Sequence, residues 1–468
     1  MRHGVYVTEQ ATSVATPLGA ESGVPFVVGL APVHRADSPA KPGVPVLCTS
    51  WSEAVEKLGY SDNWEKYTLC EFMYSHFKLF TCQPVIFCNV LDVSKTEAVE
   101  ASDMTVVGHK VTLPMEAVDS SVVINSTDGV VLENGTDYAT YYDGENLIIE
   151  LLTDGSAYTS QTINVSYSQV VVDATAADIA VGIESAELCL TLLGTTPDLI
   201  CVPGWSHDPA IAAAMVAKAG NINGLFHAKA LIDIDCGSDG TATYTAALAA
   251  KSAQKMTDPD QIVCWPMLTL GDRRFHMSTQ IAGLMAEVDT RNDGCPYESP
   301  SNKNLHCDGL CLANGSEVTL TFTQANQLNA SGIMTALNFV NGWVAWGNYT
   351  GCYPENKEAK DSIIPISRMF AWAGNTLIKT FWSKLDKPMN RRLIDTVLDA
   401  ANIWLNGVVG KGYLLGARVA MYDDENTLTN LMAGIIKLHI YMTPPGPAQE
   451  IDFVLEYDSS YVSNALQS

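Results

Sequence analysis

The order of apolar and polar positions from residue 197 onward predicts a layered α/β domain. The apolar run PDLICVPGW (197–205) has the length and composition of a buried strand. The next segment has helical periodicity, with Asp208 placed to cap its first turn and Gly220 placed just past its end. A second apolar run at 224–235 completes a predicted strand–helix–strand unit.

The same alternation continues along the chain. We predict a helix at 244–256, a strand at 261–270 and a helix at 278–291, and strand and helix patterns also occupy 51–92. This order predicts an α/β (α+β) fold with a layered core that is built from N-terminal and C-terminal parts of the chain.

Residues 100–175 follow a different pattern. Short runs of Val, Ile, Leu and Tyr alternate there with Asp-Gly, Asn-Gly and Asp-Gly-Ser turns, which predicts an inserted antiparallel β-domain. From Val111 to Ala217 the sequence contains no Lys or Arg, while acidic residues recur throughout. Such a surface suits a module that projects into solvent.

The C-terminal third is predicted to be more helical, with one apolar and one polar face between residues 390 and 409. The apolar face consists of Leu393, Ile394, Val397, Leu398, Ala401, Trp404 and Leu405, and the polar face of Asp395, Asp399 and Asn402. Four cationic residues gather just before this helix: Lys384, Lys387, Arg391 and Arg392. Two interpretations of this cationic cluster stay open, a solvated helix start and a docking point for an acidic partner.

Strand-like runs lie close to both ends of the sequence. Two of them, 437–442 and 450–457, flank a Pro-Pro-Gly-Pro turn, and HGVYVTEQ (3–10) is a similar extended run. Unpaired strand edges are a means by which one chain pairs with another. We therefore expect an extended arm at each end.

The predicted organisation has six parts. They are an N-terminal arm (1–20), a first part of the core (21–99), the inserted β-rich domain (100–175), a second α/β part of the core (176–360), a helical C-terminal part of the inner core (361–446) and a C-terminal arm (447–468).

Composition limits the partners. The chain of 468 residues carries a formal net charge of -25, from 27 basic and 52 acidic residues, so its surface repels phosphate backbones and we expect no nucleic acid partner. No apolar run approaches the length of a membrane span and the N-terminal region has no secretion signal. We expect a soluble protein, made in a cytoplasm, with no membrane insertion and with its twelve cysteines free and mostly buried.

The loop YESPSNKNLHCDG (297–309) contains the residue types of hydrolytic and metal sites. Pro300 fixes its backbone, and Asn302 and Asn304 can bond the neighbouring main chain. We therefore interpret the loop as a rigid connector between the helix at 278–291 and a predicted polar strand at 317–324. The rival hypothesis is an α/β hydrolase-like enzyme that uses His306 with Ser299 or Ser301.

Metal and phosphate motifs are incomplete. The set Cys295, His306, Cys307 and Cys311 lacks the Cys-x2-Cys pairs of a zinc site, and Asp233, Asp235 and Asp239 lack the glycine and glutamate of an EF-hand loop. The segment NGVVGKGYLLG (406–416) departs from a phosphate-binding loop at two defining positions. We expect no catalytic residue, no metal and no cofactor.

Several segments in a fixed order carry a family likeness. ESPSNKNLHCDGL (298–310) and LNASGIMTALNFVNGWVAWGNYTG (328–351) resemble the Ser-Pro-Ser-Asn loop, helix and strand of contractile tail sheath proteins from myovirus-type bacteriophages and R-type tailocins. Three other segments are similar to further motifs of that family: PDLICVPGW, HGVYVTEQ and IYMTPPGPAQEIDFVLEY (440–457). The last of them resembles a closing hairpin. Only the β insert interrupts the likeness.

The resemblance implies a structural subunit that forms stacked hexameric rings around an inner tube and contracts to drive the tube through a target cell envelope. It also implies terminal arms that add strands to sheets of neighbouring subunits. The residues that take this role here are Gly4, Val5, Tyr6, Val7, Thr8, Glu9, Glu450, Ile451, Asp452, Phe453, Val454, Leu455, Glu456 and Tyr457. The four residues of the cationic cluster are the candidates for contact with the tube.

The partners implied are further copies of this chain, an inner tail tube protein, and baseplate and tail-terminator proteins. The implied location is the tail of a virion or a tailocin particle, assembled in the cytoplasm of a bacterial host. A hydrolase-like enzyme and a tube or shell protein that does not contract remain the alternatives.

Overall fold

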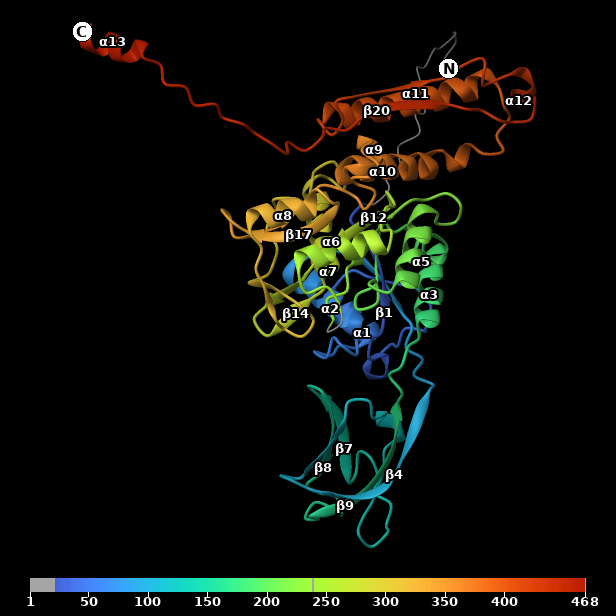
Figure 1. Cartoon of the computed structure of the whole chain (residues 1–468). Coiled ribbons are helices and arrows are strands. Elements are labelled where there is room, and N and C mark those ends of the chain that lie inside the picture. Colours follow the sequence, from blue (N-terminus) through green and yellow to red (C-terminus); the bar gives the residue numbers. More distant parts are fainter. Residues whose placement is uncertain (1–21, 238–239, 468) are drawn as a thin grey trace, which may run out of the picture.

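A computed structural model describes residues 22–237 and 240–467. Within these residues an eight-stranded sheet has the order β18-β17-β12-β11-β10-β1-β3-β2 (Figure 1). The pairs between β17, β12, β11, β10, β1 and β3 are parallel, and antiparallel pairs with β18 and β2 close the two edges. The strands are β1 (Pro25–Gly29), β2 (Val46–Cys48), β3 (Val85–Asn89), β10 (Leu199–Cys201), β11 (Lys229–Asp233), β12 (Gln261–Cys264), β17 (Ile333–Asn338) and β18 (Trp343–Trp346).

The α-helices lie mostly between these strands in sequence. They are α1 (Trp51–Leu58), α2 (Thr68–Tyr74), α3 (Ala176–Glu184), α4 (Cys189–Leu193), α5 (Pro209–Gly220), α6 (Tyr244–Ala253), α7 (Met277–Arg291), α8 (Phe322–Asn329), α9 (Ala359–Ser362), α10 (Ile364–Phe381), α11 (Arg391–Gly410), α12 (Leu428–Met432) and α13 (Ser460–Gln467). The predicted cap of α5 is confirmed, because the Asp208 carboxylate accepts hydrogen bonds from the N–H groups of Ala210 and Ile211.

Helices cover both faces of the sheet. A Cβ atom on Gly182 of α3 would lie 2.5 Å from Val28, and one on the next strand residue, Gly29, would lie 2.4 Å from the Thr68 hydroxyl of α2. Successive strand residues point to opposite faces, so α3 and α2 lie on opposite sides of β1. The close approach at Gly182 leaves no room for a side chain there.

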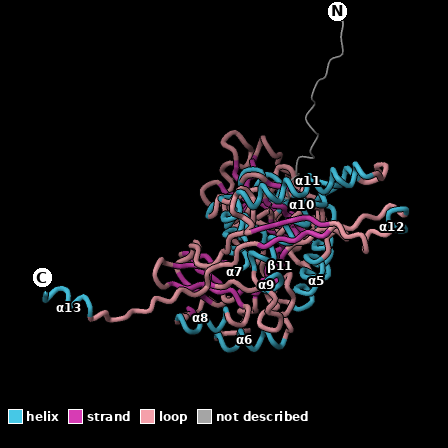
Figure 2. The backbone as a smooth tube through the Cα atoms, turned by 90° about the horizontal axis from the view of Figure 1, so that it is seen from above, coloured by secondary structure: helices cyan, strands magenta, loops and turns pink. Residues whose placement is uncertain are grey.

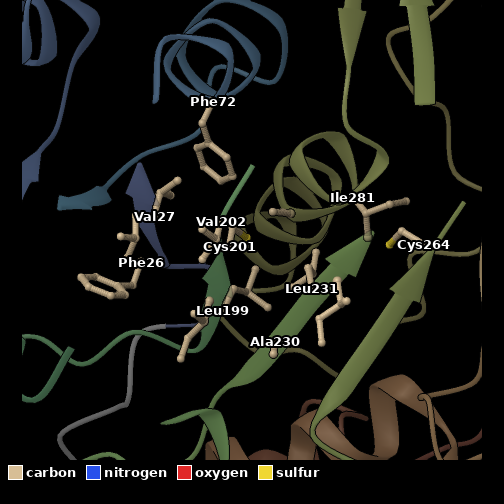
Figure 3. Close-up of a cluster of buried hydrophobic side chains, with 14 of the residues drawn as sticks. Phe26, Val27, Phe72, Leu199, Cys201, Val202, Ala230, Leu231, Cys264 and Ile281 are labelled. Carbon is tan, nitrogen blue, oxygen red and sulfur yellow. The ribbon is translucent and has the colours of Figure 1, made fainter. Parts of the chain in front are cut away.

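The main core fills the space between the sheet and these helices. Side chains of β1, β10, β11 and β12 lie beside Phe72 of α2 and Ile281 of α7 (Figure 3). The strands are apolar on both faces, as expected of a parallel sheet covered by helices on both sides. The prediction of an α/β protein is confirmed, with a central mixed sheet and several small antiparallel sheets.

Two of the small sheets lie between β3 and β10 in sequence and share a separate cluster of buried side chains (Figure 1). One has the order β4-β9-β6 and the other β5-β8-β7. Their strands are β4 (Thr96–Thr105), β5 (Lys110–Pro114), β6 (Val123–Asn125), β7 (Tyr138–Asp143), β8 (Asn146–Leu151) and β9 (Thr162–Val170). A further sheet, β14-β13-β15-β16, packs beside the main sheet and contains β13 (Met267–Leu270), β14 (Arg273–Phe275), β15 (Gly309–Cys311) and β16 (Glu317–Val318).

The segment 361–443 forms a layer at one end of the molecule (Figures 1 and 2). It contains α10, α11 and the two-stranded antiparallel sheet of β19 (Gly416–Ala420) and β20 (His439–Thr443). Buried polar contacts attach α10 to the main sheet. The Lys229 ammonium donates to the Ser367 hydroxyl at 2.7 Å, and the Asn375 side chain bonds both the N–H and the C=O of His227.

Two predictions about strands were wrong. Residues 317–324 were predicted as one polar strand, but β16 ends at Val318 and α8 begins at Phe322. Thr321 and Gln324 form a capping box there, which satisfies the first N–H groups of the helix. The closing hairpin was also wrong, since β20 pairs with β19 and not with residues 450–457.

Candidate assembly surfaces

The C-terminal segment leaves the body of the molecule. After β20 the chain runs as an extended coil away from the layer and leads into α13 (Figures 1 and 2). Phe453 is 86% exposed and Leu455 is 95% exposed, and Ile451, Val454 and Tyr457 are similarly open to solvent. Burying a side chain of this size is worth about 1.5–3 kcal/mol, so a free subunit presents a large unsatisfied apolar surface here.

The sheet of β19 and β20 is partly covered. Among the described residues it has two strands only, so each strand has one free edge. Its inner face consists of Ala417, Val419, Ile440 and Met442, which pack against a small cluster that includes Leu405 and Val408 of α11. That cluster stabilises the sheet from one side.

The outer face of the sheet is polar and aromatic. Arg418 lies opposite Tyr441 in the register, and its guanidinium carbon is 4.0 Å from the centre of the Tyr441 ring. The Tyr441 hydroxyl is 3.1 Å from that of Tyr422. Glu425 bonds both Lys437 and His439 beside them, and among the described residues Arg418 has no carboxylate partner. An exposed guanidinium, packed on Tyr441 and without a carboxylate partner among the described residues, therefore lies in the middle of this face.

The cationic cluster lies where α10 gives way to α11. Lys384 ends a short 3-10 turn, and Arg391 and Arg392 begin α11 after the cap Asn390, whose side chain accepts from the Leu393 N–H. Arg391 pairs with Asp395 on the same helix but its side chain stays 83% exposed. Within the described part of the chain, Lys384, Lys387 and Arg392 form no ion pair. The four residues thus lie along the connection from α10 to α11, where Lys384 is half-buried and the other three are exposed.

The residues Gly4 to Glu9, predicted as the N-terminal arm strand, lie outside the described residues. The C-terminal candidates Glu450 to Tyr457 are described, and they form no strand within this chain. Sequence reasoning missed β19, whose five residues GARVA carry only a short alternating pattern, and therefore missed Arg418.

The loop 297–309 holds a neighbouring segment of the chain in place through hydrogen bonds. The Ser299 hydroxyl donates to the Asn348 side chain at 2.5 Å, and the Ser301 hydroxyl accepts from the Gly347 N–H at 3.1 Å. His306 is exposed and lies edge-on against Phe80. No hydrogen bond joins either serine to His306 in the described residues, so the geometry supports a connector.

At the part of the sheet where an α/β fold binds ligands, carboxylates of the chain itself already bond the neighbouring helix N-terminus. The strand order reverses between β1 and β10, and an open cavity of about 560 Å³ lies beyond the ends of these strands. Two carboxylates already accept from the N-terminus of α7. Asp233 bonds the N–H of Ser278 at 2.9 Å, and Glu71 bonds the N–H of His276 at 2.7 Å. An external anion would have to displace both.

The Glu71 carboxylate also bonds the His276 imidazole at 2.8 Å. Burial opposes a charge on the ring, but the carboxylate outweighs burial and raises the pKa of His276 to about 9. His276 is therefore protonated at neutral pH, and its bond to Glu71 ties α2 to α7.

The cysteines are thiols. All twelve are free, and every one except Cys307 is buried. Burial raises the pKa of Cys295 and of Cys307 to about 12, which makes both poor nucleophiles and poor metal ligands. Across the described residues, no three His, Cys, Asp or Glu side chains are grouped to hold a metal ion; Asp239 lies outside those residues. No helix in the same residues combines the length and apolarity of a membrane span.

Comparison with known proteins identifies the class. The chain is 22% identical to the tail sheath protein of Burkholderia phage BcepMu, over 98% of this chain and 97% of that protein. It is 23% identical to a putative prophage major tail sheath protein of Pseudomonas aeruginosa strain UCBPP-PA14, over 99% of this chain and 98% of that protein. No protein-family model matches the sequence.

Solved structures show the same fold. The helical sheath of the anti-feeding prophage in its contracted state matches with a TM-score of 0.59 at 15% identity, over 97% of this chain and 99% of that chain. The contracted sheath of the extracellular contractile injection system PVC matches with a TM-score of 0.58 at 14% identity, over 98% and 99% of the two chains. The resemblance drawn from the motifs is confirmed: this chain is a distant homologue of phage and prophage tail sheath proteins, matched over nearly the whole of both chains, and it shares the fold of the sheaths of contractile injection systems. Tail sheath proteins are structural and not enzymes.

Proposed function

We propose that the chain polymerises as stacked hexameric rings around an inner tube and contracts to drive that tube through a target cell envelope. The chain is a contractile tail sheath subunit by homology. The observation that carries the assembly mode is the exposed apolar segment 450–457, which leaves a body whose β19–β20 sheet keeps free edges. In a free subunit, the exposed apolar segment and the unpaired strand edges both favour aggregation. Between two copies, the segment of one can cover the edge of the other.

In this proposal Glu450–Tyr457 adds a strand to a neighbouring subunit, and so does Gly4–Glu9 from the other end of the chain. Main-chain hydrogen bonds provide the strength of such a junction, and alternate side chains fix its register. A contact between two different surfaces, repeated with a fixed rise and rotation, builds an open helix. A tube requires that kind of symmetry.

We propose the division of labour along the chain that the sequence suggested. Residues 21–99 and 176–360 form the core, 361–446 form its inner C-terminal part, and 1–20 and 447–468 are the arms. The inserted region 100–175 projects outward, and its separate buried cluster supports its treatment as a domain. Lys384, Lys387, Arg391 and Arg392 provide a weak contact with the tube, because exposed ion pairs contribute little individually and release readily.

During contraction each subunit moves as a nearly rigid body while the arms stay paired, so one ring pulls the next. The buried bonds between α10 and the main sheet support this, because they oppose relative movement of the C-terminal layer and the core. New apolar contacts between cores supply the energy, at roughly 25 cal/mol for each Å² buried, and the extended state is held by a kinetic barrier.

The proposed partners are other copies of the chain, an inner tube protein, and baseplate and terminator proteins. Support comes from the matching anti-feeding prophage structures, which include a baseplate and a helical sheath. The proposed location is the tail of a phage or of a related contractile particle.

Electron microscopy of the purified full-length chain tests the proposal. We expect tubes or stacked rings, and only small oligomers from a variant that lacks residues 447–468. A hydrolase-like enzyme would instead stay a small oligomer with its tail intact. Tubes whose length and diameter never change when the complete particle is triggered would favour a shell that does not contract.

A further inference from the structure

One long stretch of the chain carries no charge. From Val318 to Pro354 the sequence contains no Asp, Glu, Lys, Arg or His, although at the 17% charged content of the whole chain these 37 residues would carry about six charges. The stretch contains α8, β17 and β18, and so includes one edge of the main sheet. In a subunit with a net charge of -25, an uncharged surface is where a second acidic copy meets the least repulsion.

Apolar side chains protrude from this uncharged surface. The rings of Phe322, at the start of α8, and Phe339, in the β17–β18 turn, are stacked with their centres 5.4 Å apart, and Phe322 also meets Trp346 edge-on. Phe339 is 67% exposed and Val340 is 79% exposed. We call Phe322, Phe339 and Val340 the aromatic flank. An exposed apolar patch of this kind marks an interaction site.

An open groove lies beside the aromatic flank. It has a volume of about 550 Å³ and lies between β16 and β17, and its apolar lining includes Leu320, Leu337 and Trp343. Asn338 also lines the groove and pairs with Trp343 in the register, so the turn that carries Phe339 begins at the groove. This side of the molecule therefore combines protruding rings with a hollow that an aliphatic side chain can enter.

A second exposed apolar patch lies on the helices α3 and α4. Four aliphatic side chains form it, and we call them the leucine flank: Val181 on α3, Leu188 in the 3-10 turn that follows, Leu192 on α4, and Leu225 after α5. The Asn223 side chain donates to the Glu187 carbonyl at 2.8 Å, which holds the loop of Leu225 beside the helices. Glu184 and Glu187 both pair with Lys218, so part of the negative charge beside the leucines is compensated.

The two flanks lie on opposite sides of the molecule. Figure 1 shows α8 and β17 on one side of the main body and α3 and α5 on the other, between the insert at one end and the C-terminal layer at the opposite end. One chain therefore cannot cover its leucine flank with its own aromatic flank. A contact between two unlike surfaces of identical copies repeats from copy to copy, as a ring or a tube requires.

We propose that the aromatic flank of one copy packs on the leucine flank of a neighbouring copy, with aliphatic side chains entering the groove beside Trp343. This inference rests on the proposed function and names the surfaces through which two cores meet side by side, without any part of the arms. The centre of a contact between proteins is depleted of charged residues and enriched in aromatic ones, which is the composition of the stretch from Val318 to Pro354.

Cross-linking between copies tests the pairing. One copy carries Phe339→Cys or Val340→Cys, and a second copy carries Leu188→Cys or Leu192→Cys. We expect disulfide-linked dimers in co-assembled tubes from at least one of these four combinations. The control Val107→Cys, a similarly exposed site on the insert, should form no dimer with either leucine position.

A chain that carries both cysteines of a linking pair gives a second measurement. Each copy then has one cysteine on either flank, so its tubes should yield a ladder of linked trimers and larger multimers. Dimers from Val340→Cys alone would mean that two aromatic flanks meet each other, and would overturn the pairing.

The outcomes separate the two proposals. Tubes in which none of the four combinations links would overturn the pairing of the flanks, while the sheath function would stand. Wild-type protein that forms no tube or ring under any condition would overturn the proposed function itself.

Polar variants test whether the aromatic flank contributes to assembly. Phe339→Ser with Val340→Ser should raise the lowest concentration at which tubes form by about tenfold or more, because the apolar area buried between copies is lost. Val130→Ser with Val131→Ser is the matched control, since it removes two exposed apolar side chains from the insert, and it should leave that concentration unchanged. Equal effects of the two pairs would overturn the role of the aromatic flank.

A charge exchange tests which surfaces meet. Val340→Glu and Leu192→Lys should each weaken assembly, because each buries a charge without a partner. Both changes in one chain should restore assembly to within about threefold of the wild type, whereas Val340→Glu with Leu192→Glu should not recover. Failure of the first combination to recover, with each variant folded by circular dichroism, would overturn the pairing.

Discussion

The guanidinium of Arg368 on α10 holds the carboxylate of Asp289 on α7 through two hydrogen bonds, of 2.5 and 3.1 Å. It also bonds Asp198, which precedes β10, at 2.6 Å. Burial opposes the charge on Arg368, but the two carboxylates outweigh burial and raise its pKa. One side chain therefore joins the C-terminal layer, the helix beneath it and the central sheet.

Arg368→Met should destabilise the subunit by about 3–5 kcal/mol, because it leaves buried carboxylates without their counter-charge. Chemical denaturation of an assembly-deficient subunit, shortened before residue 447, measures this. Arg291→Met, on the exposed side of α7, is the matched control and should cost less than about 0.5 kcal/mol. A similar cost for both variants would mean that the α10 attachment does not depend on this group.

His76 should make the fold sensitive to acid. The side chain is fully buried in a π-helical turn that follows α2 and is stacked on Phe72, and both ring nitrogens lack hydrogen-bond partners in the described structure. Burial lowers its pKa to about 3, whereas in the unfolded chain it titrates near 6.5. As pH falls from 6.5 to 3 the unfolded state takes up the proton first, so the free energy of unfolding decreases, by about 2 kcal/mol at pH 5.

His76→Phe should remove that decrease, and denaturation at pH 7.5 and pH 5 measures it. The control His227→Gln alters an exposed ring and should leave the difference between the two pH values unchanged. An unaltered acid dependence in His76→Phe would show that the ring is accessible to protons in the native state.

His276 should make the free energy of unfolding decrease as pH rises, the opposite of the effect of His76. Its pKa is raised to about 9, so the stabilisation by Glu71 is complete below the unfolded value of 6.5 and is lost as pH rises through 9. His276→Gln should therefore destabilise the subunit by about 2–3 kcal/mol at pH 6 and by much less at pH 9.5. Glu71→Gln should show the same dependence on pH, and a cost that is constant from pH 6 to 9.5 would contradict the ion pair.

Excision of the inserted region should leave a folded core. Thr96 and Val170 are paired in the β4–β9 register, so an Asn-Gly turn can replace residues 97–169 without moving the ends. The variant loses the Lys66–Glu116 ion pair and the two hydrogen bonds that the Ser61 hydroxyl and the Asp62 N–H donate to Glu145, and we expect a cost of about 1–3 kcal/mol with one cooperative transition. An insoluble product, or one without a cooperative transition by circular dichroism, would show that core and insert fold as one unit.

Predictions from local signals held where the interaction is local. Asp208 caps α5 because its side chain reaches N–H groups two and three residues away, which any surroundings would permit. The wrong strand at 317–324 carried such a signal too, since Thr321 and Gln324 have capping-box spacing, but the alternation of Thr with apolar residues outweighed it.

The C-terminal pairing was a different kind of error. Residues 437–442 and 450–457 both have strand patterns and flank a Pro-Pro-Gly-Pro turn, and the family resemblance implied a closing hairpin there. The partner that β20 has is β19, beyond the excursion that contains α12. Strand patterns state that a segment can pair and which face is apolar, but they do not choose among several possible partners.

The sequence alone determined the alternating core, the acidic insert, the extended C-terminal segment and the order of family motifs, because each depends on residue type and spacing along the chain. The tertiary structure decided which charges are buried together and which strand β20 joins. Those choices depend on the packing of α10 and α11 against distant parts of the chain, where burial makes an unpaired charge or backbone group costly. That cost is set by the folded surroundings, and spacing along the chain does not encode it.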